Sequence, residues 1–280
     1  MNDTLLLGAV AYDPKVVTIW DGFREWFKQH DFDFDYVLFS NYERQVAAHF
    51  DGLFHVGWSS PLAWVQTDRV AKARGIQAGT LCMRDTDQDL TSVIVSRAGS
   101  GIEGIEDLRG KTVGVGAPDS PQATLIPLNH LAAAGLEPGR DFEVRQFDVL
   151  FGKHGDHIGG ERDAVKALIK GEVDAACMID GNHLLFAQEG TLQRGSTQIV
   201  TRTEHYDHCI FTTLPGRDAT LLGRFNDLLL SMSYDDPEVR QLLDLEGLKQ
   251  WRPGRLSGFQ QLNQACDRFG YIDDFVAGLS

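Results

Sequence analysis

Two successive sets of alternating strands and helices limit the folds that this chain can adopt. The first set begins with an apolar run at 5–11, followed at 16–30 by large apolar side chains at helical spacing. Strands are expected at 34–40 and 52–57, and a helix at 60–74 begins with a serine cap and a proline. This alternation, with short glycine-bearing turns, predicts a mostly parallel sheet covered by helices on both faces.

A second α/β set follows Asp89 and predicts a second lobe. Its expected strands and helices lie at 91–97, 112–116, 122–134, 142–147, 161–170 and 173–178. We therefore expect two α/β lobes, the first from residues 1–92 plus 208–280 and the second from residues 93–207. Two crossover segments, near 92–97 and 205–212, would join them, and such an arrangement places a ligand cleft between the lobes.

Composition excludes several classes of partner. The 280 residues include 40 Asp and Glu against 26 Lys and Arg, a formal net charge of −14. Nucleic acids and anionic membrane surfaces both require clustered cations, so neither is expected as a partner. No apolar run reaches the roughly 18 residues that cross a bilayer, so membrane insertion is not expected either. A small-molecule ligand or substrate is the expected partner.

The start of the chain and the cysteines bear on the compartment. Residues 1–4 carry no cation, and the apolar run that follows is interrupted by Tyr12, Asp13 and Pro14, unlike a secretory signal. The four cysteines are scattered without a CxxC pair, as expected for free thiols in a reducing compartment. The sequence therefore predicts a cytoplasmic protein, or a periplasmic one if a signal peptide has been removed.

A family resemblance enters at residues 101–141 (GIEGIEDLRGKTVGVGAPDSPQATLIPLNHLAAAGLEPGRD). This stretch resembles the phosphate, phosphite and phosphonate substrate-binding proteins of ABC transporters, in the type 2 periplasmic-binding-protein superfamily. Further similarity lies at 6–13, 51–60 and 164–176. The resemblance implies a two-lobed α/β fold, with two mostly parallel sheets joined by two crossover strands.

The chain departs from this family where the family binds its anion. Phosphonate receptors carry a Ser-Thr-Ser-Gly run there, whereas this chain has Ser120, Pro121, Gln122, Ala123 and Thr124. Pro121 removes a backbone donor, and Glu161 stands near the position of a family histidine that joins the anion site. The resemblance implies ligand contacts at Ser120, Gln122 and Thr124, but a carboxylate repels a phosphonate. We expect the fold to be inherited and the phosphonate ligand not to be.

The loop at 152–163 concentrates the candidate chemistry. His154, Asp156, His157 and Glu161 supply proton donors, acceptors or metal ligands. One interpretation makes His154 or His157 a general base, with Glu161 or Asp180 as orienting carboxylate or acid. The alternative is a solvated polar loop that caps the next helix. The spacing matches no standard metal motif, so no cofactor is predicted and a divalent metal is kept only as an alternative.

Other candidate ligand contacts follow or lie within expected strands. Each also has a structural interpretation: a core histidine for His55, a helix cap for Asp180, and a polar crossover for His208. Trp58 and Ser59 match the family's strand-to-helix turn, and the resemblance places a ligand-contacting acid near Asp180.

The acid-rich run 83–89 is expected to be a solvated loop, because the glycine and closing glutamate of a calcium loop are missing. The alternative is that Arg84, within this run, forms an ion pair in a closed lobe interface.

These observations favour a cytosolic enzyme built on a solute-binding fold. The absent signal and the acid–base loop suggest lyase-like chemistry, such as decarboxylation or elimination, by analogy with lyases of the same superfamily. The alternative is a non-catalytic substrate-binding protein that serves an ABC permease, or a soluble ligand sensor. The length of the resemblance and the absence of a catalytic motif favour this alternative.

Overall fold

The computed structural model describes residues 4–280, which fall into two compact units. The first unit comprises residues 4–88, 207–259 and 272–280, and the second comprises residues 89–206 and 260–271. Residues 1–3, on which the compartment prediction partly rests, lie outside the described residues. Within 4–280, no helix combines the length and apolar character that crossing a membrane requires.

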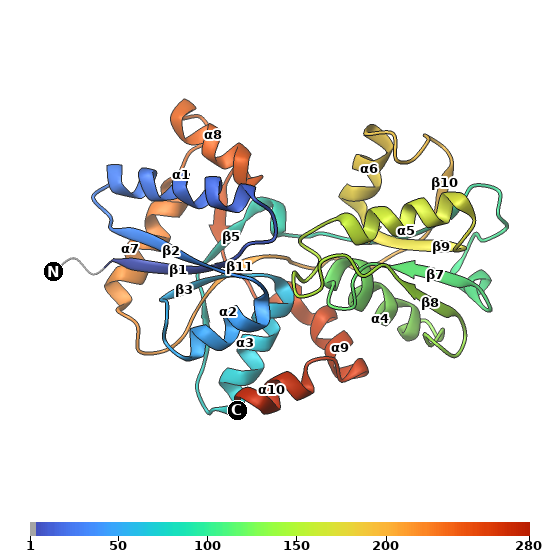
Figure 1. Cartoon of the computed structure of the whole chain (residues 1–280), viewed down its shortest axis with the longest axis horizontal. Helices are drawn as coiled ribbons and strands as arrows, with labels where there is room; N and C mark the ends of the chain where they lie inside the picture. Colours follow the sequence, from blue (N-terminus) through green and yellow to red (C-terminus); the bar gives the residue numbers. More distant parts are fainter. Residues whose placement is uncertain (1–3) are drawn as a thin grey trace. The chain divides into compact units, whose positions relative to one another are not determined.

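The sheet of the first unit has the order β2-β1-β3-β11-β4 (Figure 1). Its strands are β1 (Leu5–Val10), β2 (Phe34–Phe39), β3 (Val56–Ser59), β4 (Gly79–Thr80) and β11 (Ile210–Thr213). β1 runs parallel to β2 and β3, whereas β11 runs antiparallel to β3 and β4. A separate pair, β5 (Cys82–Arg84) with β12 (Trp251–Pro253), is antiparallel. The carboxyl ends of β1, β2 and β3 therefore meet at one edge, where β11 begins.

Helices cover both faces of this sheet. They are α1 (Lys15–Gln29), α2 (Tyr42–Phe50), α3 (Pro61–Ala73), α7 (Ala219–Ser231), α8 (Pro237–Glu246) and α10 (Asp273–Leu279). One face packs Leu5 and Leu7 against aromatic side chains of α1, in a core that includes Trp58 and Phe211. The other face packs Val10 against α2 and α3. Alternate residues of β1 thus serve opposite faces, as a buried parallel strand requires.

The second sheet has the order β10-β6-β9-β7-β8. Its strands are β6 (Ser92–Arg97), β7 (Thr112–Val115), β8 (Glu143–Gln146), β9 (Ala175–Ile179) and β10 (Thr197–Arg202). β7 is parallel to β8 and β9, whereas β6 is antiparallel to β9 and β10. The carboxyl ends of β7, β8 and β9 meet at one edge, and β6 starts there because Ser92 pairs with Ile179.

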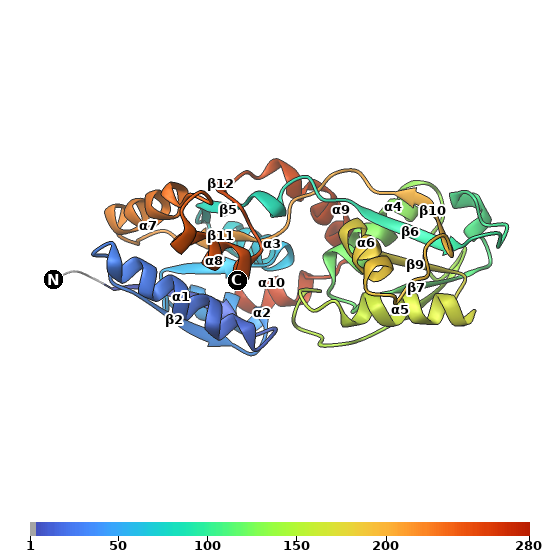
Figure 2. The ribbon, with the colours of Figure 1, turned by 90° about the horizontal axis from the view of Figure 1, so that it is seen from above.

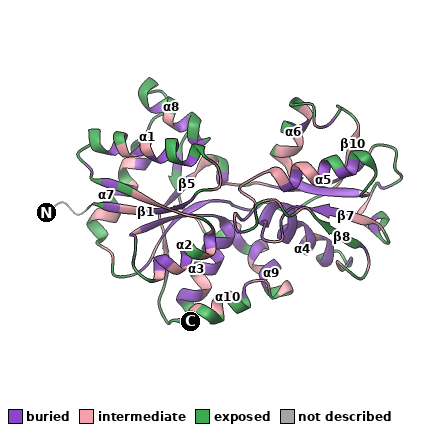
Figure 3. Cartoon of the chain, in the orientation of Figure 1, coloured by how far each residue is buried: buried purple, intermediate pink, exposed green. Residues whose placement is uncertain are grey.

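Helices also cover both faces of the second sheet. They are α4 (Ile126–Ala133), α5 (Gly159–Lys170), α6 (Asp180–Gln188) and α9 (Gln260–Phe269). Figure 2 shows α5 and α4 on opposite faces. Val93 and Val95 of β6 pack with α5, whereas Ile94 packs with α4. Figure 3 shows that the buried residues of each unit are concentrated in its strands and in the inward faces of its helices.

The expected α/β class is confirmed, with two differences. Both sheets are mixed rather than mostly parallel, because β6 and β11 enter antiparallel to their neighbours. Residues 260–271 were expected in the first lobe but belong to the second unit. α9 packs there against α4, and Arg268 donates a hydrogen bond to Asn129. The predicted ligand cleft between the lobes stays a prediction.

Candidate functional site

The candidate residues His55, Trp58 and Ser59 make contacts within the first unit. His55 precedes β3 at the amino edge of the sheet, where its Nδ1 accepts a hydrogen bond from Leu6 N at 2.8 Å. Trp58 is 5% exposed and packs edge-on against Trp20 and Trp251. Ser59 Oγ lies 2.9 Å from Thr212 Oγ1 of the neighbouring strand. The structure therefore separates His55 from the carboxyl edge and places Trp58 and Ser59 in the packed interior of the unit.

A buried ion-pair network follows β5, where a solvated loop was expected. Asp87 is 2% exposed, and the Arg84 guanidinium donates to both of its oxygens, with Nε–Oδ2 at 2.5 Å and Nη2–Oδ1 at 2.9 Å. Arg84 also donates to the buried Glu246 carboxylate at 3.2 Å and stacks over Trp58. Burial opposes ionisation of Asp87, but Arg84 and His208 bring its pKa down to about 2. The expectation of a solvated loop is wrong at Asp87, because the guanidinium compensates its desolvation.

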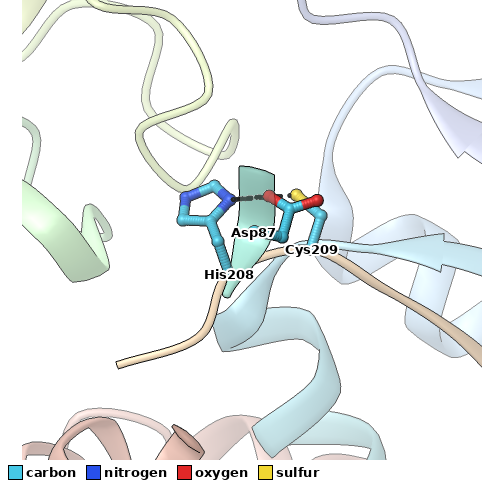
Figure 4. Close-up of side chains that lie close together, drawn as sticks. All are labelled: Asp87, His208 and Cys209. Carbon is cyan, nitrogen blue, oxygen red and sulfur yellow. Dashed lines mark hydrogen bonds and ion pairs between the residues drawn. The ribbon is translucent and has the colours of Figure 1, made fainter. Parts of the chain in front are cut away.

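His208 and Cys209 lie beside this network, immediately before β11 (Figure 4). His208 Nδ1 is 3.1 Å from Cys209 Sγ and 3.5 Å from Asp87 Oδ1. The three donor atoms of Asp87, His208 and Cys209 lie within 4.8 Å of one another, which is compatible with a metal site. Both oxygens of Asp87 already accept hydrogen bonds from Arg84, so a metal ion would have to compete with a guanidinium. The arrangement fits a structural polar cluster better than a metal centre.

In the second unit, the predicted residues after β7 lie in and directly before a π-helical turn, Pro121–Leu125. Ser120 caps this turn, and its Oγ accepts a hydrogen bond from Ala123 N at 3.2 Å. Thr124 Oγ1 donates to Ala117 O at 2.8 Å, and Gln122 Nε2 donates to Gly155 O at 2.7 Å. All three side chains are buried. The polar groups of Ser120 and Thr124 are therefore used within the turn.

The loop at 148–158 closes onto this turn. The Asp119 carboxylate accepts hydrogen bonds from Gly152 N at 2.6 Å and from His154 N at 3.1 Å. Gly155 has a φ of 78° and lies so close to Ser120 that a Cβ would collide with Ser120 Oγ. His154 is fully buried and has a φ of 51°, in the left-handed region that favours glycine. Burial raises the pKa of Asp119, and interactions with His154 offset this only in part.

The predicted catalytic residues of α5 and of the loop before it occupy different environments. Glu161 is 3% exposed and accepts hydrogen bonds from Asn182 Nδ2 at 2.7 Å and from Ile179 N at 3.3 Å. His157 is half-buried, and its Nδ1 accepts a hydrogen bond at 3.1 Å from the N–H of Gly159, the first residue of α5. Asp156, also half-buried, donates its backbone N–H to Lys153 O at 3.0 Å. His157 Nδ1 is thus bonded to the start of α5.

Asp180 begins α6, directly after β9. Its Oδ2 accepts from Arg202 Nη1 at 2.7 Å and from Thr91 Oγ1 at 2.9 Å. Its side chain is 39% exposed. Asp180, Glu161 and Ser120 thus lie at the carboxyl edge of the parallel strands, where α/β sheets bind ligands. The structure brings these residues to one edge, and their ligand role stays a prediction.

Sequence reasoning missed two buried acids, Asp87 and Asp119. A signal was present at Asp119, because it directly precedes the Ser120 cap in the segment that follows a buried strand. Asp87 gave no such signal. Its partner Arg84 is three residues away, but Glu246, which also binds Arg84, and His208 lie more than 100 residues away in the chain.

Three solved structures share this fold over nearly the whole chain. PhnD1 from Prochlorococcus marinus, in complex with methylphosphonate, has a TM-score of 0.71 and 18% identity, covering 97% of this chain and 100% of that one. XAC2383 from Xanthomonas citri, bound to ATP, has a TM-score of 0.71 and 16% identity, with coverage of 98% and 99%. The aliphatic sulphonate binding protein SsuA from Escherichia coli has a TM-score of 0.63 and 15% identity, with coverage of 99% and 94%. At these identities the likeness establishes the two-lobed type 2 fold.

The family match corrects the functional prediction. The model of the family described as "ABC transporter, phosphonate, periplasmic substrate-binding protein" matches residues 9–259. The prediction of a lyase-like enzyme is wrong, because both this family and the structural neighbours are solute-binding proteins. The resemblance seen at residues 101–141 is confirmed over most of the chain. The chain belongs to the periplasmic substrate-binding proteins of phosphonate ABC transporters.

Proposed function

We propose that this protein is the substrate-binding component of an ABC transporter, which binds a small organic molecule reversibly and passes it to a membrane permease. The observation that carries this proposal is the family match over residues 9–259. We also propose that the protein acts in the periplasm beside the permease. This replaces the cytoplasmic location predicted from the start of the chain.

The contacts of the predicted catalytic residues support binding rather than proton transfer. A general base needs a lone pair within hydrogen-bond reach of the substrate proton. His157 Nδ1 already accepts from a backbone N–H, and Asp180 is paired with Arg202 and Thr91. These groups are well placed to fix the shape of a binding edge.

The chemical class of the ligand follows first from the family, whose description names phosphonates. Structural neighbours were solved with methylphosphonate and with ATP, and one is an aliphatic sulphonate binder. We propose a small, polar organic molecule of comparable size to methylphosphonate, held at the carboxyl edge of the second sheet.

Isothermal titration calorimetry with methylphosphonate, aminomethylphosphonate and ethanesulfonate tests this function. The small molecules released by denaturing the purified protein are identified in parallel by mass spectrometry. We expect stoichiometric, reversible binding of at least one solute, recovered unchanged when examined by NMR. Chemical conversion of a bound solute would overturn the proposal. So would the absence of binding by all three probes together with the absence of any released small molecule.

A further inference from the structure

A cavity of about 340 Å³ lies at the amino edge of the sheet in the first unit. It is lined by Thr4, His55, Gly216, Arg217, Asp218 and Leu221. Thr4 precedes β1, His55 precedes β3, and the other four residues follow β11, which runs antiparallel to β3 and so ends at this edge. The cavity is therefore at the opposite end of the strands from the carboxyl edge, where α/β sheets usually bind ligands.

Arg217 supplies this cavity with a guanidinium that forms no ion pair within residues 4–280. Its Nε atom is buried and has no hydrogen-bond partner in the same part of the chain. Its terminal nitrogens lie beside the turn after α2, because a Cβ placed on Gly52 would be 3.6 Å from Nη2. A guanidinium that is partly removed from water and lacks a paired acid is stabilised by an anion.

The charge of Arg217 is also felt inside the unit. Burial chiefly, and the positive charge of Arg217 in addition, lower the pKa of His49 to about 3. An acid that fully compensated Arg217 would cancel its effect on the His49 imidazole. The folded chain thus leaves positive charge at this cavity.

Two other lining residues are suited to donate hydrogen bonds. His55 Nδ1 accepts from Leu6 N at 2.8 Å, so the proton of the neutral ring is on Nε2. The ring therefore offers a donor at its other nitrogen, and the Thr4 hydroxyl is a donor as well. Both residues suit a ligand that presents acceptors.

Asp218 limits the charge of such a ligand. Its Oδ1 accepts from Thr220 N at 2.7 Å and from Leu221 N at 3.1 Å, and this cap of α7 offsets part of the carboxylate charge. The remaining charge repels a phosphate dianion more strongly than a monoanion. One planar guanidinium matches one carboxylate, and the Leu221 side chain can contact an aliphatic group.

We infer that the first unit holds a second binding site, in which Arg217 binds the carboxylate of a small aliphatic carboxylic acid. His55 and Thr4 donate to the same carboxylate, and Leu221 contacts the aliphatic part. This site is separate from the solute site proposed at the second sheet, so it does not depend on the proposed function.

Amide NMR of the full chain, titrated with propionate and with propionamide, tests the site. The two probes have nearly the same shape and differ in charge. We expect propionate to shift the amide signals of Gly216, Asp218 and Leu221 saturably, and to bind about 10- to 100-fold more tightly than propionamide. Equal responses to the two probes, or no saturable shift at these amides, would overturn the inference. Propionate shifts confined to the segments after β7 and β9 would do the same and leave the proposed function intact.

The variant Arg217→Gln tests the cation directly. We expect its affinity for propionate to fall by about 10- to 100-fold. Arg44→Gln is the matched control, because Arg44 is exposed on α2 and its loss changes the net charge equally. Unchanged affinity in Arg217→Gln would refute the assignment. The comparison of the two probes in the parent protein decides the matter if this variant does not fold.

The variant Asp218→Asn is expected to act in the opposite direction. Its carbonyl oxygen can still accept from Thr220 N and Leu221 N, so the cap of α7 is kept while the negative charge is lost. We expect propionate to bind about 3- to 10-fold more tightly, because a like charge has been removed from the cavity. Unchanged or weaker binding would contradict a carboxylate placed beside Arg217 and Asp218.

Discussion

Asp87 in the first unit and Asp119 in the second are both buried carboxylates, with 2% and 1% of their surface exposed. Asp87 faces the Arg84 guanidinium, which contributes to a pKa of about 2. Asp119 accepts its hydrogen bonds from backbone N–H groups, and burial raises its pKa. The first unit therefore compensates its buried acid with a guanidinium, whereas backbone N–H groups and the nearby His154 offset the burial of Asp119 only in part.

Removing the cation from the first unit has the largest expected effect. Arg84→Met leaves Asp87 and Glu246 buried without the guanidinium that now bonds to both. We expect the free energy of unfolding to fall by about 3–5 kcal/mol, measured by urea denaturation. Arg140→Met is the control, because Arg140 is 69% exposed and its pair with Asp141 is worth less than about 1 kcal/mol. A similar loss in both variants would contradict the role assigned to Arg84.

A second buried group in the first unit, the His49 imidazole, makes the stability of the protein depend on pH. Burial lowers the pKa of His49 to about 3, below its ordinary value of 6.5. The unfolded chain therefore takes up a proton below pH 6.5 while the folded protein does not, and stability falls as the pH falls. We expect a loss of about 2 kcal/mol between pH 7 and pH 5, measured by thermal or urea unfolding. The loss should shrink in His49→Gln, and an unchanged pH dependence in that variant would refute the assignment.

The variant Asp87→Asn tests whether the charge of the buried Asp87 carboxylate stabilises the first unit. Its folded pKa of about 2 lies below the ordinary value of 3.8, so its contribution is complete above about pH 4 and is lost toward pH 2. We expect Asp87→Asn to lower the free energy of unfolding by about 2 kcal/mol at pH 7. The difference from the parent protein should close at pH 2. A difference independent of pH would mean that the charge of Asp87 is not responsible.

Neutralising Asp119 has the smallest expected effect on stability and the opposite sign. A raised pKa means that folding disfavours the charged carboxylate, so Asp119→Asn should raise the stability of the ligand-free protein at pH 7. The advantage should fade as the pH falls through the raised pKa, where Asp119 itself becomes neutral. Differential scanning calorimetry at pH 7 and pH 4 measures this. Destabilisation at pH 7 would show that the charged carboxylate stabilises the fold.

Local patterns were sufficient for most elements of the fold. The expected helices at 60–74 and 161–170 match α3 and α5 closely, because caps and glycine stops mark their ends. α9 was not predicted, although its apolar face is strongly segregated, and its place in the second unit depends on contacts with α4 far earlier in the chain. The antiparallel entry of β6 and β11 depends likewise on distant pairing.

The candidate site could be predicted only in part. The segments after β7 and β9 were identified, because polar residues that follow buried strands gather at one sheet edge. His55 was misplaced, because it lies at the amino end of β3 and its ring bonds to the backbone of β1. The enzymatic prediction relied on the start of the chain and on an acid–base loop, and neither indicates what the folded side chains contact.

The sequence by itself determined the α/β class, the family and the departure from its anion-binding run at residues 120–124, because these depend on local periodicity and motif. Only the tertiary structure decided which acids are neutralised. Whether a carboxylate is paired depends on partners brought together by folding, as Glu246 is with Arg84 and as the 152–154 backbone is with Asp119. That difference in pairing explains why the pKa of Asp87 is lowered and that of Asp119 is raised, although both carboxylates are buried.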